Sequence, residues 1–262
     1  MMHTISYIQR LTWFLSDTWE LVKRNLFHIF RDLDQIFGLI TQPIIYTLLF
    51  LFLFGGAINV GSIDYVNYLI PGMLVTNVLF ASIVTSVGIS NDLKTGIIDR
   101  FRSLPISQCA VINSYIIASV LRAVIVILIV FILGLILGFR PTTGPQDWFF
   151  AFGILLLMAF ATSCLLTLIG FISKSVEAAQ QFAALIVLPF AMISPALVPI
   201  NTLPYFLRIF AEHQPYTHTI EAVRSLLFGN PLSNHLLMSL TWFLTIIIIT
   251  FTLTSYLFSK RS

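Results

Sequence analysis

The chain has 262 residues, of which 58% are hydrophobic and only 10% are charged, and its mean hydropathy is +0.95. Ordinary soluble domains are about 45–50% apolar and about 25% charged, because a globule must cover itself with polar groups. This composition excludes a soluble protein, and a net charge of +3 is too small to indicate a nucleic-acid partner. The sequence predicts an all-α polytopic membrane protein.

Residues 1–35 predict an interfacial amphipathic helix on the cytoplasmic leaflet. Apolar residues recur at roughly helical spacing through residues 6–33, and charged residues occupy much of the remainder. Trp13 and Trp19 suit the headgroup level of the bilayer. The segment lacks the apolar region and cleavage site of a signal peptide.

The next part of the chain, residues 36–258, predicts one six-helix transmembrane domain, since a spanning helix needs about 20 apolar residues. The six stretches are residues 36–58, 65–90, 118–139, 148–173, 178–198 and 235–258. Of the 14 Lys and Arg residues, ten then fall on cytoplasmic segments, three on outer segments and one, Arg122, within a span. This bias predicts that both termini are cytoplasmic.

A charged loop, residues 91–107, separates the second and third spans. It reads NDLKTGIIDRFRSLPIS, with an apolar stripe at helical spacing and Pro105 after it. The stripe and the charges beside it are Ile97, Ile98, Phe101, Leu104, Asp92, Lys94, Asp99, Arg100 and Arg102. A simple basic anchor would explain Arg100 and Arg102 but not the acidic residues, Gly96 and the stripe. We expect a short surface helix that docks in a groove of another protein.

The outer segment, residues 199–234, is too long for a simple turn and too apolar for a free loop. Two short helices broken at Pro215 would form a re-entrant hairpin, whose backbone is tolerated only where it packs on protein or faces water. We expect Glu212 or Glu221 to pair with Arg208 or Arg224 and to pin this hairpin.

The sequence offers no convincing metal or catalytic site. His213 and His218 are five residues apart with a proline between them, which does not match a helical zinc motif. Cys109 and Cys164 form no CxxC pair, and each is expected to be a small buried apolar residue. The chain has no nucleophile or oxyanion signature, which disfavours a membrane enzyme.

Two blocks of sequence resemble a known family. DLKTGIIDRFRSLPIS, residues 92–107, resembles the loop of type-2 ABC exporter permeases, in particular the membrane subunit of daunorubicin-type drug exporters. FAEHQPYTHTIEAVRSLLFG, residues 210–229, resembles the outer segment of the same family. GFRP at residues 138–141 and SVEAAQ at residues 175–180 also fit, so the resemblance covers essentially the whole chain.

The resemblance implies that two permease copies, expected to be a homodimer, form the pathway and that two separate ATPase subunits bind beneath them. ATP and Mg²⁺ would belong to the ATPase, and this chain would hold no cofactor or metal. The loop would carry the ATPase-coupling residues, which are Asp92, Lys94, Gly96, Asp99, Arg100, Phe101, Arg102 and Pro105. The outer segment would be a gate or lid, with Glu212, Pro215, Glu221 and Arg224.

The expected function is outward transport of an amphiphilic drug or lipid-like molecule across the bacterial cytoplasmic membrane. The chain has no G-x-x-x-x-G-K-[ST] motif, so ATP hydrolysis is expected from a partner. No line of acidic residues crosses the spans, which argues against an ion-coupled carrier and predicts an apolar, aromatic pathway. A permease for polysaccharide or lipid-linked glycan, and a channel or carrier without ATPase, remain alternatives.

Two further features lie inside the predicted spans. Arg122 either snorkels towards the cytoplasm or makes a structural contact, which we favour, or it faces the dimer interior and contacts substrate or a partner carbonyl. Gly134 and Gly138 form a small-xxx-small pattern that points to a dimer seam.

Overall fold

The computed structural model describes residues 7–55, 64–103, 107–197, 199–231 and 234–260. These residues form ten α-helices and one short 3-10 helix, and no β-strand occurs among them. The α-helices are α1 (Tyr7–Arg31), α2 (Leu33–Phe54), α3 (Tyr65–Lys94), α4 (Ile97–Arg102), α5 (Gln108–Ile136), α6 (Pro145–Ile172), α7 (Val176–Met192), α8 (Tyr205–His213), α9 (Pro215–Phe228) and α10 (His235–Lys260), and the 3-10 helix is Ile200–Thr202. The predicted all-α class is confirmed.

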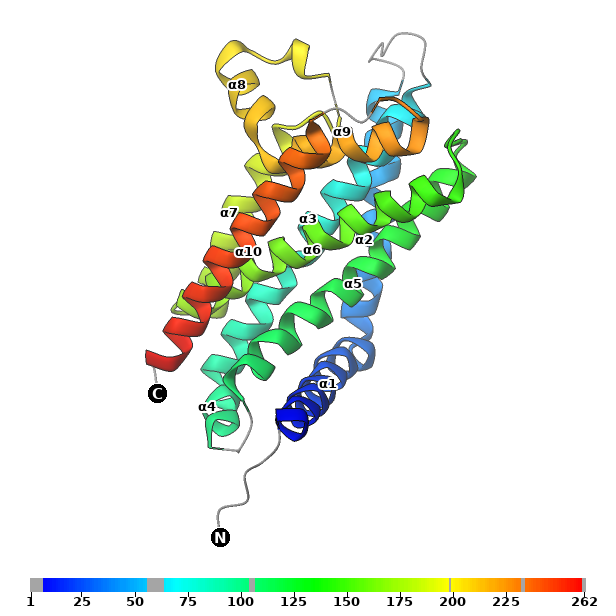
Figure 1. Cartoon of the computed structure of the whole chain (residues 1–262). Helices are drawn as coiled ribbons and strands as arrows, with labels where there is room; N and C mark the ends of the chain where they lie inside the picture. The colour runs from blue at the N-terminus through cyan, green and yellow to red at the C-terminus, as the bar shows by residue number, and fades with distance from the viewer. Residues whose placement is uncertain (1–6, 56–63, 104–106, 198, 232–233, 261–262) are drawn as a thin grey trace.

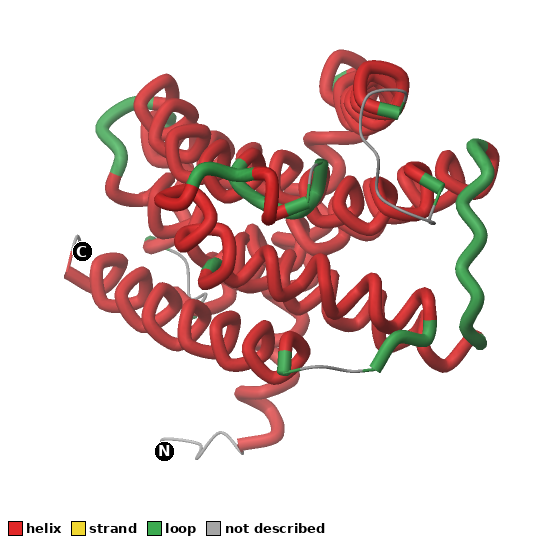
Figure 2. Tube along the Cα trace, turned by 90° about the horizontal axis from the view of Figure 1, so that it is seen from above, coloured by secondary structure: helices red, strands yellow, loops and turns green. Residues whose placement is uncertain are grey.

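The long helices α2, α3, α5, α6, α7 and α10 run between the two ends of one bundle (Figure 1). One end carries α4, the start of α1 and the end of α10, and is called the α4 end below. The opposite end carries α8 and α9 and is called the α9 end. Figure 2, seen from above, shows that every regular element is helical.

Within the described ranges, five helices are long and apolar enough to cross a membrane. They are Leu33–Phe54, Tyr65–Lys94, Cys109–Ile136, Pro145–Ile172 and His235–Phe258. The helix α7 is apolar but shorter, with 17 residues. The chain is therefore a multi-pass helical membrane protein, and a helix occupies most of each of the six predicted stretches.

The largest boundary error concerns α5, which begins at Gln108 and not at residue 118. Ser107 caps this helix, because its side-chain oxygen accepts a hydrogen bond from the backbone N–H of Ala110 at 3.1 Å. The polar residues of the early turns lower the local hydropathy, but one of them is satisfied by another helix. The amide of Asn25 in α1 donates to the hydroxyl of Ser114 at 3.2 Å.

Other boundaries differ by less. The helix α2 ends at Phe54, and residue 58 lies outside the described residues. The helix α7 ends at Met192, whereas the predicted stretch continues to residue 198. Beyond Met192 the chain leaves the helix and packs the backbone of Ala196 against α3, where Ala196 is fully buried.

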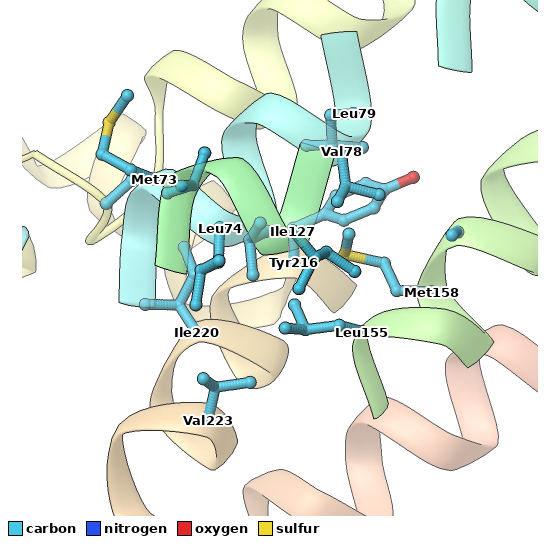
Figure 3. Packing of buried hydrophobic residues seen from close by; sticks show 14 of the residues in the cluster. Met73, Leu74, Val78, Leu79, Ile127, Leu155, Met158, Tyr216, Ile220 and Val223 are labelled. Atoms are coloured by element: carbon cyan, nitrogen blue, oxygen red, sulfur yellow. The ribbon is translucent and has the colours of Figure 1, made fainter. Parts of the chain in front are cut away.

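The helix α3 forms the centre of the bundle. In its apolar span 67% of the residues are buried, against 11% for α2 and 17% for α10, so the latter two are peripheral. Figure 3 shows Met73, Leu74 and Val78 of α3 among buried side chains from α5, α6 and α9. Large apolar side chains such as Phe52 of α2 and Ile248 of α10 are exposed, as lipid-facing residues are.

Two glycines bring backbones into close contact with α3. A Cβ atom at Gly72 would lie 2.5 Å from the Cα atom of Ala196, and one at Gly170 of α6 would lie 2.5 Å from the carbonyl oxygen of Ser86. Small residues allow such close approach between membrane helices, where packing replaces the hydrophobic driving force. The position of α3 is therefore fixed by backbone contacts near both of its ends.

The proposed dimer seam at Gly134 and Gly138 is not supported by the geometry. Gly134 is buried within the chain, and a Cβ atom there would lie 3.1 Å from Ile70 of α3. Gly138 lies beyond the end of α5 and has φ of +101°. The two glycines thus serve a helix contact inside one chain and a turn.

Replacement of Gly170 by alanine should destabilise the fold by about 1–3 kcal/mol, because the new methyl group meets backbone that cannot rotate away. The matched control is Gly153→Ala in the same helix, where nothing lies within 4 Å of the added Cβ. That change should be neutral or stabilise by about 0.5–1 kcal/mol, since alanine is the better helix former. Unfolding in detergent micelles measures both variants, and equal effects would contradict the close contact.

Candidate functional site

The connection from α3 to α4 is built around one glycine. The hydroxyl of Thr95 and its backbone N–H both donate to the carbonyl of Asn91, each at 2.9 Å, and end α3. Gly96 follows with φ of +72°, a conformation that favours glycine because it has no Cβ atom. The direction of α4 relative to α3 therefore depends on Gly96.

The apolar stripe of α4 is directed into the protein. Ile98 is 1% exposed and Phe101 is half-buried, and both belong to a core cluster at the α4 end. The other buried members come from α1, α3, α5, α6 and α10, namely Leu21, Ile89, Val111, Ile112, Tyr115, Ile116, Cys164, Phe171 and Phe258. Ile98 and Phe101 of the stripe therefore pack in the protein's own core, so a partner that docks on α4 would meet its other face.

The outer surface at α4 is charged. Lys94 at the end of α3 and Asp99 and Arg100 of α4 are exposed. Leu104 and Pro105 lie outside the described residues, and so does the side chain of Arg102. Any partner that reaches α4 meets charged and polar groups of both signs.

Asp92 faces inward, unlike Lys94, Asp99 and Arg100. Its residue exposure is 8%, its carboxylate accepts a hydrogen bond from the guanidinium of Arg24 at 2.8 Å, and the hydroxyl of Tyr115 donates to the same oxygen. Arg24 also lies over the ring of Phe101, 5.0 Å from its centroid. One arginine of α1 thus joins α3, α4 and α5.

The charge state of Arg24 is secured by this arrangement. Burial disfavours the charged guanidinium, but the hydrogen bond from Arg24 to Asp92 and the negative charge of Asp92 outweigh it, so the pKa of Arg24 is raised. An opposite charge that is both close and hydrogen-bonded favours the ionised form. Arg24 therefore stays positively charged.

The helix α1 is amphipathic in the predicted manner. Leu21 and Val22 are buried against the bundle, whereas Trp13 and Trp19 are exposed. This orientation leaves the two indole rings available to the headgroup region of a membrane. The second half of α1 attaches this helix to the bundle, because Arg24 bonds to α3 and Asn25 bonds to α5.

At the α9 end, the chain breaks between α8 and α9 at Gln214, and Pro215 opens α9. The two ion pairs expected from sequence both form within helices: Arg208 contacts Glu212 at 2.7 Å, and Arg224 contacts Glu221 at 2.7 Å. The first pair is exposed on α8, which is a surface helix. The second belongs to α9, most of whose side chains are buried.

Arg224 fastens α9 to the rest of the bundle. Its guanidinium donates to the carbonyl oxygens of Tyr68 at 2.8 Å and Pro195 at 2.6 Å, and it lies 3.7 Å from the centroid of the Tyr68 ring. Tyr68 and Pro195 are 156 and 29 residues away in sequence, so neighbouring motifs give no signal of them. Of the gate residues expected from sequence, Pro215, Glu221 and Arg224 thus belong to the packed helix α9, whereas Glu212 lies on the exposed helix α8.

A pair of histidines joins α9 to α10. The Nδ1 atoms of His218 and His235 are 2.9 Å apart, so one neutral ring donates and the other accepts. Burial, together with His235 and His213, lowers the pKa of His218. Among the described residues, no group of three His, Cys, Asp or Glu side chains is placed to hold a metal ion.

Some residues were missed or misplaced by the sequence analysis. No sequence motif marks Arg24 or Tyr115 as partners of Asp92. For Arg24, a signal existed in its position, because it is a charged residue on the apolar-facing side of an amphipathic helix. Arg122 is 8% exposed and lies well inside α5, because that helix begins at Gln108, so it does not snorkel from a helix start near residue 118. Both cysteines are free, Cys164 buried as expected and Cys109 exposed, contrary to expectation.

This geometry defines a class of protein: a membrane-embedded helical bundle with a charged surface helix at one end and a packed cap at the other. A family model described as ABC-2 type transporter matches residues 16–228, from within α1 to the last residue of α9. Since this match covers most of the chain, the protein belongs to the ABC-2 type transporter family.

Three relatives illustrate the similarity. The daunorubicin resistance ABC transporter permease protein DrrB1 of Streptomyces coeruleorubidus is 28% identical over 79% of this chain and 76% of its own length. The probable doxorubicin resistance ABC transporter permease protein DrrC of Mycobacterium tuberculosis is 25% identical over 87% of this chain and 83% of its own. The putative transport permease ycf38 of Porphyra purpurea is 26% identical over 78% and 71%.

Replacement of Asp92 by asparagine should destabilise the protein by about 1–3 kcal/mol, because a partly buried guanidinium loses its counter-charge. The matched control is Glu20→Gln, which breaks the exposed pair between Glu20 and Lys23 of α1 and should cost about 0.5 kcal/mol or less. Thermal unfolding of both variants in micelles tests this, and a similar small loss for both would show that the Arg24 pair is not structural.

Acid should weaken the fold through His218. Its folded-state pKa lies below the unfolded value of about 6.5, so the unfolded chain binds the proton more readily and stability falls as pH drops from 6.5 towards the folded-state pKa. The difference in melting temperature between pH about 7.5 and about 5.5 should shrink in His218→Gln. The control is the exposed His213→Gln, which removes only the smallest of the three causes of the lowered pKa of His218 and should reduce the slope far less. An unchanged slope in His218→Gln would refute the prediction.

Proposed function

We propose that this chain is the membrane-spanning permease subunit of an ATP-driven exporter that moves an amphiphilic drug or lipid-like molecule outward across a bacterial cytoplasmic membrane. Membership of the ABC-2 type transporter family supports this proposal, as do relatives named for daunorubicin and doxorubicin resistance. The sequence has no Gly-Lys pair and hence no Walker-type phosphate loop. A separate ATPase, with its own ATP and Mg²⁺, would supply the energy.

The proposed topology has six crossings, namely the five helices that are long enough to span a membrane and, in addition, α7. The start of α1 and the end of α10 lie at the same end of the bundle, which requires an even number of crossings (Figure 1). The 17 residues of α7 extend about 26 Å at about 1.5 Å per residue, close to the roughly 30 Å thickness of a hydrocarbon core.

The α4 end is proposed to face the cytoplasm. Its described basic residues are Lys23, Arg24, Arg31, Lys94, Arg100, Lys174 and Lys260, and those at the α9 end are Arg140, Arg208 and Arg224. This distribution agrees with the positive-inside rule. Both termini are then cytoplasmic, and α1 lies along the inner leaflet.

The helix α4 is proposed to be the coupling helix that receives the ATPase. The observation that carries this assignment is its two-sided construction: Ile98 is buried in the core of the permease, and Lys94, Asp99 and Arg100 face outward. A force on the charged face is transmitted to five other helices through the core cluster. Arg24 adds a second connection, from Phe101 to α1 and α3.

The α9 end is proposed to close the outer side of the pathway. The helix α9 would be the buried arm of a re-entrant hairpin and α8 its exposed arm, with the break before Pro215 at the tip. Opening would require separation of α9 from Tyr68 and Pro195, to which Arg224 bonds. A second copy of the chain is proposed to complete the pathway.

Charge reversal of Arg100 to glutamate should reduce binding of the ATPase and drug-stimulated ATP hydrolysis by tenfold or more, because like charges across an interface cost several kcal/mol. The matched control is Arg208→Glu, which makes the same charge change on exposed α8 at the opposite end. Co-purification of the permease with the proposed ATPase subunit gives the measurement.

Arg208→Glu should leave ATPase binding unchanged. Equal losses in both variants would remove α4 from the coupling role. Uphill transport by the purified chain without any ATPase would favour the carrier or channel alternative and refute the exporter assignment.

A further inference from the structure

Arg122 of α5 is a buried guanidinium that the protein leaves almost without partners. Its contact to the carbonyl oxygen of Ala81 is long, 3.5 Å, and its Nε atom has no hydrogen-bond partner. Among the described residues, no carboxylate lies within ion-pair distance of it. A charged group inside a bilayer is costly and is expected to face a partner or a water-filled space.

Arg224 shows how the same chain compensates a buried arginine that holds the fold together. Both terminal nitrogens of Arg224 are hydrogen-bonded, and one of their partners is the carboxylate of Glu221. Arg224 also stacks on Tyr68, and only its Nε lacks a partner. Among the residues that the structure describes, neither a carboxylate nor an aromatic ring compensates Arg122 in this way. The contrast indicates that acceptors for Arg122 come from outside the chain.

The surroundings of Arg122 are hollow. A cavity of about 400 Å³ between α1, α2, α3 and α5 extends from Arg24 and Asp92 to Arg122. A second cavity of about 180 Å³ continues along α2 and α3 past Gln42 and Asn77. Arg122, Gln35 and Val84 line both, so the two cavities are adjacent and Arg122 stands where they meet.

The first cavity leads back to the surface at the α4 end. A wide hollow of about 790 Å³ at the junction of α1 and α2 shares Arg24 with it and includes Arg31 and Asp34. Polar side chains accompany this route, since Gln35 and Gln42 are seven residues apart on one face of α2. The sequence analysis considered only ionisable groups in the spans and therefore expected an apolar pathway.

The positive and negative charges that line the first cavity do not balance. Its charged lining residues are Arg24, Arg122 and Asp92, and the carboxylate of Asp92 is already engaged by Arg24 and Tyr115. One positive charge remains, that of Arg122. A planar guanidinium presents a fork of donors that matches the oxygens of a phosphate or carboxylate.

Apolar surface lies beside the charge. Leu39, Pro43 and Val126 line the second cavity, and Val84 of α3 is 42% exposed at the point where the two cavities join. A ligand with an anionic head on Arg122 would thus place an apolar chain against α2 and α3 in the plane of the membrane. An inorganic anion would leave this surface uncovered.

We propose that Arg122 anchors a binding site for an acidic amphiphile, with its phosphate or carboxylate headgroup in the two joined cavities and its apolar chain along α2 and α3. The site belongs to the permease alone, and only the role of the bound molecule as cargo rests on the proposed function. The proposed site also defines the class of amphiphile, which is one with a negatively charged headgroup.

The test is binding of phosphatidic acid to the purified chain in maltoside micelles, followed by native mass spectrometry. The wild type should bind phosphatidic acid at least tenfold more tightly than phosphatidylcholine, because only the former offers an uncompensated anion. Arg122→Gln should lose this preference and Arg122→Lys should retain part of it. Lys174→Gln, an exposed lysine outside the cavities, is the charge-matched control and should behave as the wild type.

A second variant, Val84→Trp, changes no charge but fills the opening that the two cavities share. It should also weaken binding of phosphatidic acid about tenfold. It covers the case in which Arg122→Gln does not fold. Equal binding of phosphatidic acid by wild type, Arg122→Gln and Val84→Trp would overturn the site. Displacement of the lipid by millimolar inorganic phosphate would show that the site binds simple anions and would overturn the proposal that its ligand is an amphiphile.

These outcomes are independent of the ATPase, so they separate this inference from the proposed function. Loss of the lipid preference in Arg122→Gln with normal ATPase binding supports the site. If the assembled transporter binds phosphatidic acid through Arg122 but does not move it, the role as cargo is refuted and the binding site stands.

Discussion

A charged or polar group buried in a membrane needs a hydrogen-bonding partner, because the hydrocarbon core offers none. In this chain that constraint acts on three arginines, and each is resolved differently. Arg24 is paired with Asp92 at the α4 end, and Arg224 is bonded to Glu221 and two carbonyls at the α9 end. Both arginines bond to α3, through Asp92 and through the carbonyl of Tyr68. The central helix is thus held at its two ends by guanidinium groups from α1 and α9, and Arg122 lies between them.

Arg24 and Arg224 hold α3 at its two ends, so α3 can act as a rigid element between them. Between them its backbone is in close contact with neighbouring chain at Gly72 and at Ser86, so it has little freedom to slide. At one end it continues through Gly96 into α4, and at the other it supports α9. If α4 receives the ATPase, displacement there is carried along α3 as a rigid element towards the outer cap. Close-packed elements respond by discrete repacking more than by gradual bending.

Hydropathy predicted the approximate place of the apolar helices because lipid-facing and core residues are both apolar, although only five of the six predicted stretches hold a helix long enough to span a membrane. It failed at the start of α5, where Ser114 is polar yet is paired with Asn25 of α1. The break before Pro215 and the pair of Arg224 with Glu221 were predictable because they depend on neighbours in sequence. The bonds of Arg224 to Tyr68 and Pro195, and of Asp92 to Arg24, were not, because they join residues far apart. The burial of Ile98 was not predictable for the same reason, since an apolar stripe fits the protein's own core as well as a partner's groove.

The short length of α4 bears on how it would transmit force. A helix of six residues is far below the length at which an isolated helix is stable in water, so its structure comes from tertiary packing and not from propensity. Ile98 fixes one face in the core cluster, and Gly96 fixes the angle at which the helix leaves α3. A partner that displaces α4 therefore cannot simply unwind or rotate it without disturbing the core to which it belongs. If α4 receives the ATPase, the burial of Ile98 would let a force on the charged face move the whole α4 end.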